Sequence, residues 1–160
     1  MAVEDRIRDL GLTVPSPPVN PPGVEIPFEW VRVHGDRAYV SGHGALDPEG
    51  RPVGPFGQVP SEVTLEQAQA SAQLAGLAII ASLRHAIGDL ERITAWLTVS
   101  GFVNAEPGYA KTTAVLNPVS DLLLAAFGES VGRHARTAIG VAALPLNLPV
   151  VIGAEVEIRR

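Results

Sequence analysis

The segment 133–145 combines two arginines and a histidine with a run of small and β-branched residues. Arg136 stands at the head of this run, which is otherwise apolar and typical of a short strand. Its guanidinium needs an anionic partner, because burying an unpaired charge is costly. The planar fork suits a carboxylate held by two parallel hydrogen bonds. Two explanations follow: a structural ion pair with an aspartate or glutamate of the same chain, or a site for an anionic ligand.

The composition narrows the class of protein. The four histidines share no metal-ligand spacing and cysteine is absent, so we expect no metal site, no disulfide and no cofactor. A net charge of −5 and the lack of basic runs argue against a nucleic-acid partner. The longest apolar run, 77–83, is too short to cross a membrane, and the charged N-terminus lacks a signal-peptide core. The expected compartment is the cytoplasm.

Residues 1–24 are expected to form a short helix, 3–11, and a proline-rich arm. The spacing of Pro15 and Pro18 allows two interpretations of this arm, a stiff cover for the domain or a ligand for a polyproline-binding domain. Residues 25–160 are expected to form a single domain.

The domain is predicted to have the element order ββαβαββ. Its predicted elements are strand 28–33, strand 37–42, helix 64–88, strand 93–103, helix 118–127, a strand with Arg136 at its head and strand 150–158. Thr64 and Gln67 have the spacing of a capping box at the start of the first long helix. Asn117 and Pro118 suit the N-cap and first position of the second, and Gly128 would follow its end.

This order predicts an α+β domain of two layers, with two long helices on one face of a mainly antiparallel sheet. The strands carry valine, isoleucine and tryptophan on both sides. The face without helices therefore needs cover, and we expect it to be buried against other copies of the chain.

Several short motifs together resemble the Rid (YjgF) family. They are Tyr-Val-Ser-Gly at 39–42, the segment 85–90, Asn117, Ala135-Arg136 and Leu144-Pro145. The segments 127–129, 133–136 and 144–147 are similar to the longer subgroup, which has an added N-terminal helix. The resemblance implies a chorismate-mutase-like fold of the Bacillus type. It also implies a homotrimer in which three sheets enclose a central barrel and three clefts lie between subunits.

The best-known activity of that family is hydrolysis of reactive 2-imino acids, formed from enamines, to 2-keto acids and ammonia. The resemblance therefore implies an imine/enamine deaminase whose partner is a small 2-imino or 2-keto acid. Arg136 matches the arginine that clamps the substrate carboxylate, and Ala138 matches a position whose backbone holds the ligand. Ser41 and Gly42 match the cleft wall, and Asn117 matches a further binding position. Other members are described as ribonucleases, a role that the acidic composition does not support.

Four positions depart from the family pattern, one of them Gly153, where the family has its next acidic residue. Phe28 stands where tyrosine is frequent, His43 where glutamine is common, and Val151 where the family has a water-positioning glutamate. Valine can neither activate nor orient water, a contribution typically worth about 10²- to 10⁴-fold. His43 and His134 are the other candidates for this task, although His134 could also be a surface residue in a turn. Two functions stay open: a deaminase, or a trimer that binds a small carboxylate without catalysis.

Overall fold

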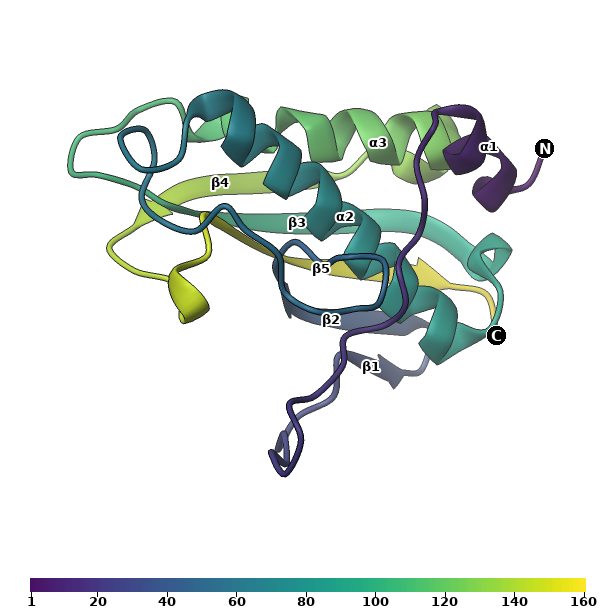
Figure 1. Ribbon diagram of the computed structural model, residues 1–160. Coiled ribbons are helices and arrows are strands. Elements are labelled where there is room, and N and C mark those ends of the chain that lie inside the picture. The colour runs from purple at the N-terminus through teal and green to yellow at the C-terminus, as the bar shows by residue number, and fades with distance from the viewer.

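The computed structural model describes all 160 residues as one α+β unit with a five-stranded sheet (Figure 1). The strands are β1 (Val31–His34), β2 (Arg37–His43), β3 (Ile93–Asn104), β4 (Ala135–Val141) and β5 (Val150–Ile158). Their order in the sheet is β1-β2-β5-β3-β4. Only β3 and β4 run parallel; the other neighbours are antiparallel. The helices α2 (Leu65–Ile87) and α3 (Thr112–Gly132) cover one face, as predicted.

The start of α2 has the predicted capping box. Thr64 Oγ1 accepts a hydrogen bond from the Gln67 amide at 3.1 Å, and Gln67 Oε1 accepts one from the Thr64 amide at 3.0 Å. Gly88, at φ 81°, ends the helix in a conformation that disfavours residues with a Cβ. The buried surface of α2 is wider than the predicted stripe, because every residue from Ala75 to Leu83 is buried.

The second long helix is longer than predicted. It begins at Thr112 rather than near Pro118, and it contains both Asn117 and Pro118. Proline lacks an N–H, so it leaves the carbonyl of Ala114, four residues earlier, without its helical donor. The side chain of Gln69, from α2, donates to that carbonyl at 2.9 Å instead. This contact between helices explains why the proline is tolerated inside α3.

The end of α3 also differs from the prediction. Gly128 has φ 81° and ψ 167° and interrupts the helix, but a further turn continues to Gly132. The chain then enters β4 at Ala135 after Arg133 and His134. This short turn places the side chain of His134 back against α3, which matters for the site described below.

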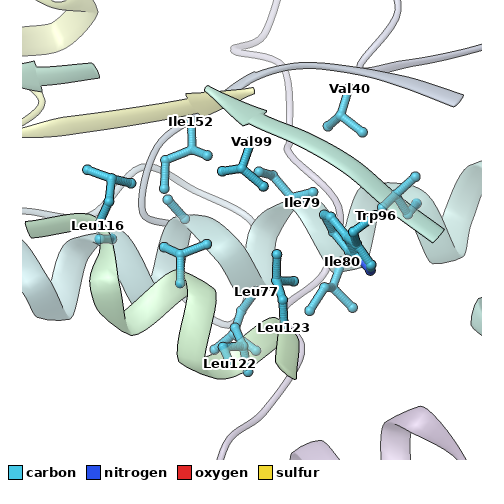
Figure 2. Close-up of a cluster of buried hydrophobic side chains, with 14 of the residues drawn as sticks. Val40, Leu77, Ile79, Ile80, Trp96, Val99, Leu116, Leu122, Leu123 and Ile152 are labelled. Atoms are coloured by element: carbon cyan, nitrogen blue, oxygen red, sulfur yellow. The ribbon is translucent and has the colours of Figure 1, made fainter. Parts of the chain in front are cut away.

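The core lies between the helices and the sheet (Figure 2). Along β5, Val150, Ile152, Val156 and Ile158 are buried, whereas the alternate residues are on the opposite face. By length and composition α2 and α3 could each span a membrane, although the longest apolar run, 77–83, is too short to do so. In this fold their buried residues form one cluster with the sheet.

The other face of the sheet has no helix over it (Figure 1). Strand register aligns Ile139, Phe102 and Val151 in one row across this face. Phe102 and Val151 are half-buried and Ile139 is 46% exposed. An apolar row on an uncovered sheet face agrees with the sequence argument that this face needs a partner.

The N-terminal segment packs on the domain. Val3 and Ile7 of α1 (Val3–Asp9) belong to the core cluster, and the following arm crosses over α2 (Figure 1). The amide of Val19 donates to the carbonyl of Gly50 at 3.0 Å, which fixes the arm to the loop after β2. A Cβ at Gly50 would lie 2.2 Å from the carbonyl oxygen of Pro17, so this contact requires glycine. These contacts favour the covering-arm interpretation of the proline-rich segment.

Candidate functional site

Arg136 extends from β4 toward α3, and all its partners are neutral. Nη1 donates to Ser120 Oγ at 3.0 Å, and Nη2 donates to Asn117 Oδ1 at 3.1 Å and to the carbonyl of Thr113 at 3.3 Å. None of the salt bridges in the structure includes Arg136. The explanation of Arg136 as a structural ion pair is therefore wrong. Its half-buried positive charge is oriented but not compensated within the chain.

His134 extends this hydrogen-bond network. Its Nδ1 lies 2.7 Å from the carbonyl oxygen of Gly132, and a carbonyl can only accept, so Nδ1 carries the proton. Nε2 then has a free lone pair and accepts from Ser120 Oγ at 2.9 Å. Ser120 thus accepts from Arg136 and donates to His134. His134 lies in the turn before β4 and is half-buried, and both of its ring nitrogens are engaged.

Ser120 was not found from the sequence. Asn117 and Ser120 are three residues apart on α3 and lie on the same side of the helix. The spacing of Asn117 and Ser120 would have pointed to a shared helix face only if the predicted helix had included Asn117. The predicted helix began at Pro118, so the pair was not recognised. Asn117 is not an N-cap; its side-chain oxygen orients Arg136. The carbonyl of Ala138 is also occupied, since Thr112 Oγ1 donates to it at 3.0 Å.

Ser41 and Gly42 lie at the other side of the sheet, where a bulge separates Val40 from His43 in the pairing of β2 with β5. Ser41 Oγ donates to the carbonyl of Glu29 at 2.7 Å. A Cβ at Gly42 would lie 2.8 Å from Val151 Cγ1, which leaves no room for a side chain. The backbone at Gly42 therefore approaches Val151 closely, and both form one surface.

His43 is buried in the core and cannot serve as the predicted base. Its Nδ1 lies 2.6 Å from the carbonyl oxygen of Ser41, and its Nε2 lies 2.7 Å from Ser82 Oγ of α2. Only 2% of the residue is exposed, and this burial lowers the pKa of His43 despite the hydrogen bond to Ser41. The ring is neutral at pH 7, with both nitrogens engaged. His43 fixes the bulge that shapes Ser41 and Gly42.

A cavity of about 430 Å³ opens beside Gly42 and Val151, and we call it the apolar cavity. Phe28 and Trp30 form one wall, with their rings edge to face at 5.2 Å. These residues precede β1, so the predicted strand 28–33 starts three residues too early. The wall also contains Pro18, Val19, Pro21, Ile26 and Leu146.

The site residues predicted from the sequence thus form two groups within one chain. Arg136, Asn117, Ala138 and His134 lie at the β4 edge, and Phe28, Ser41 and Gly42 lie at the β2 end. Three strand spacings separate β2 from β4, roughly 14 Å. Arg136 is also on the helix face of the sheet, aligned with Val99, whereas Val151 pairs with Phe102 on the opposite face. A single chain does not bring the two groups together.

Comparison with known proteins decides the family. Residues 40–156 match the family described as "YjgF/chorismate_mutase-like, putative endoribonuclease". The chain belongs to this family. The Rid (YjgF) resemblance and the fold that it implied are thereby confirmed.

Individual relatives extend the match beyond this region. Protein TCP17 of Trypanosoma cruzi is 40% identical over 102 residues, which are 64% of each protein, so the match spans just under two thirds of that relative. Atu1372 of Agrobacterium tumefaciens, a protein of unknown function, is 34% identical over 98% of this chain and 92% of its own, with a TM-score of 0.86. A "putative endoribonuclease" of Shewanella oneidensis is 28% identical over 99% and 100% of the chains, with a TM-score of 0.87.

Proposed function

We propose that this protein binds a small 2-imino or 2-keto acid through Arg136 and hydrolyses the imine to a 2-keto acid and ammonia. The observation that carries the proposal is a half-buried guanidinium with three neutral partners and no carboxylate. Those three contacts leave Nε and one N–H of Nη1 without an acceptor from the chain. A ligand carboxylate would supply the missing negative charge through charge-assisted hydrogen bonds.

The neighbouring Ser120 and His134 offer a path for the proton of the attacking water. The water oxygen adds to C2 of the protonated imine, its proton passes to Ser120 Oγ, and the hydroxyl proton passes to His134 Nε2. The imidazolium returns a proton by the same path to the nitrogen of the carbinolamine. The C–N bond then breaks, the remaining hydroxyl proton leaves with the nitrogen, and the products are a 2-keto acid and ammonium. In this scheme His134 takes the place of the carboxylate missing at Val151.

The complete site requires a second copy of the chain. The β4 group and the β2 group lie on opposite sides of one sheet, and the sheet face between them carries an uncovered apolar row. A homotrimer with clefts between subunits would bury this row and bring the two groups together. Light scattering coupled to size exclusion should then give three times the chain mass of 16.8 kDa. A monomer at micromolar concentration would contradict the shared cleft.

Binding without catalysis is the second candidate function, and the apolar Val151 favours it. The test is release of 2-keto acid from freshly generated iminopropanoate, measured against spontaneous hydrolysis. An enzyme should exceed the spontaneous rate, and His134→Ala should lose most of that excess while still binding pyruvate. A rate equal to the spontaneous one, with pyruvate binding retained, would identify a binding protein instead. Ribonuclease activity has little support, because the net charge is −5.

Arg136→Ala tests the binding half of the proposal. Charge-assisted hydrogen bonds are worth about 1.5–3 kcal/mol, so the affinity for pyruvate in calorimetric titration should fall by roughly one to two orders of magnitude. Arg133→Ala is the matched control, because Arg133 lies in the same segment but is exposed and pairs with Glu129. Equal affinities of Arg136→Ala and the natural protein would refute the role of Arg136.

A further inference from the structure

The apolar cavity points to the class of acid that this protein takes. We propose that the cavity receives the side chain of the ligand, and that the preferred ligands are 2-imino and 2-keto acids with a branched aliphatic or aromatic side chain. This inference rests on the proposed function, in which the carboxylate binds Arg136 of one subunit and the cavity of another completes the cleft.

The first argument is the chemistry of the wall. Phe28, Trp30, Ile26 and Val151 present aromatic and aliphatic groups to the cavity, and Leu146 adds an apolar side chain at its mouth with 66% of its surface exposed. Such a wall stabilises an apolar group by roughly 25 cal/mol for each Å² removed from water. It offers nothing comparable to a hydroxyl or a charged group.

The second argument is that Ser41 and His43, two polar residues near the cavity, have side chains that are already engaged. Ser41 Oγ donates to the carbonyl of Glu29. Both ring nitrogens of His43 bond to Ser41 and Ser82, so the ring presents no free nitrogen. A polar substituent of the ligand would lose its water and gain no partner from these two side chains, and such burial is unfavourable. The cavity therefore selects against serine-like and aspartate-like acids.

The third argument is size and construction. A volume of about 430 Å³ is typical of small-molecule pockets, and the methyl group of pyruvate would leave most of it unfilled. One side is formed by the N-terminal arm through Pro18, Val19 and Pro21, and the hydrogen bond from Val19 to Gly50 holds that arm in place. The cavity is thus part of the ordered fold.

The experiment is a series of dissociation constants for pyruvate, 2-oxobutanoate, 4-methyl-2-oxopentanoate and phenylpyruvate, measured by calorimetry on the natural assembly. One buried CH₂ is worth about fourfold in affinity, so 4-methyl-2-oxopentanoate should bind roughly 50-fold more tightly than pyruvate. Val151→Thr exchanges a methyl group for a hydroxyl with little change in shape. It should weaken the branched acid about tenfold and weaken pyruvate clearly less, because the small methyl group of pyruvate gains less from the wall.

Two further variants guard against a general loss of structure. Phe28→Ala removes an exposed ring from the wall and should reduce the preference for phenylpyruvate. Val24→Ala is the matched control, since Val24 lies in the same segment, is 52% exposed and is not part of the cavity. It should leave the whole series unchanged.

The outcomes separate the two proposals. Equal affinity for all four acids, each lost in Arg136→Ala, would overturn the side-chain inference and leave the proposed function standing. A preference for branched acids that Val151→Thr and Phe28→Ala do not alter would also overturn it, because the selectivity would then lie elsewhere. If none of the acids binds, the proposed function and this inference are both wrong.

Discussion

Acidification should destabilise the fold through His43, and the effect should be absent in His43→Gln. Burial lowers the pKa of His43 in the folded state, whereas the unfolded chain has the ordinary value of about 6.5. Below that pH the unfolded chain binds a proton that the native state excludes. The free energy of unfolding therefore decreases as the pH falls, until the folded pKa is reached. The structural reason is that the buried ring lies among Ser41, Ser82 and Trp30, none of which carries a negative charge.

Because a single proton is involved, the free energy of unfolding can change by at most about 1.4 kcal/mol per pH unit. Between the unfolded pKa and pH 5 the stability therefore decreases by at most about 2 kcal/mol. Urea unfolding between pH 7.5 and 5, at one fixed protein concentration, measures it. His43→Gln keeps an amide that can donate to Ser41 but cannot be protonated in this range. His85→Gln is the control, since His85 is exposed on α2 and should keep the natural slope. Equal slopes for His43→Gln and the natural protein would refute the argument.

Two further substitutions test the core packing and the apolar cavity. Gly101→Ala would place a Cβ 2.5 Å from Cδ1 and Cγ of Leu116, which is buried (Figure 2). It should therefore lower the free energy of unfolding, measured by urea titration, by about 1–3 kcal/mol. The control Ser100→Ala, on the opposite sheet face, should change the stability little, and equal stability of both variants would contradict this argument. Val151→Glu would add a carboxylate to the apolar cavity and should weaken binding of 4-methyl-2-oxopentanoate about tenfold or more; unchanged binding with faster imine hydrolysis would show instead that the missing carboxylate limits catalysis.

Much of the fold could be predicted because its signals are local. The capping box at Thr64 and the alternation along β5 depend only on neighbouring residues, and both are present in the structure. The start of α3 was predicted incorrectly because Pro118 is a local signal for a helix start. The structure overrides that signal through Gln69, which lies 45 residues away from its acceptor in sequence. No local pattern reveals a donor supplied by another helix.

The sequence singled out the arginine of the candidate site but not the residues around it. The sequence identified Arg136 as a charge that needs explanation, yet it could not show that Asn117, Ser120 and Thr113 surround it in place of a carboxylate. Likewise, His43 and His134 looked equivalent as bases. The face on which each side chain emerges distinguishes them, since His43 enters the core against α2 and His134 joins Ser120 and Arg136.

Two departures from the family pattern, Phe28 and Val151, lie close to one cavity in the structure. In the sequence Phe28 and Val151 are independent losses of a hydroxyl and a carboxylate, and each suggests a weakened enzyme. In the structure Phe28 and Val151 both line one cavity. Gly42 lies next to Val151, and because glycine has no Cβ there is room for the valine side chain. The loss of a hydroxyl and a carboxylate does not by itself explain why both positions lie on one apolar wall. If the cavity receives the side chain of the ligand, as we propose, both departures have one explanation, and Arg136 on β4 is still present to bind the carboxylate.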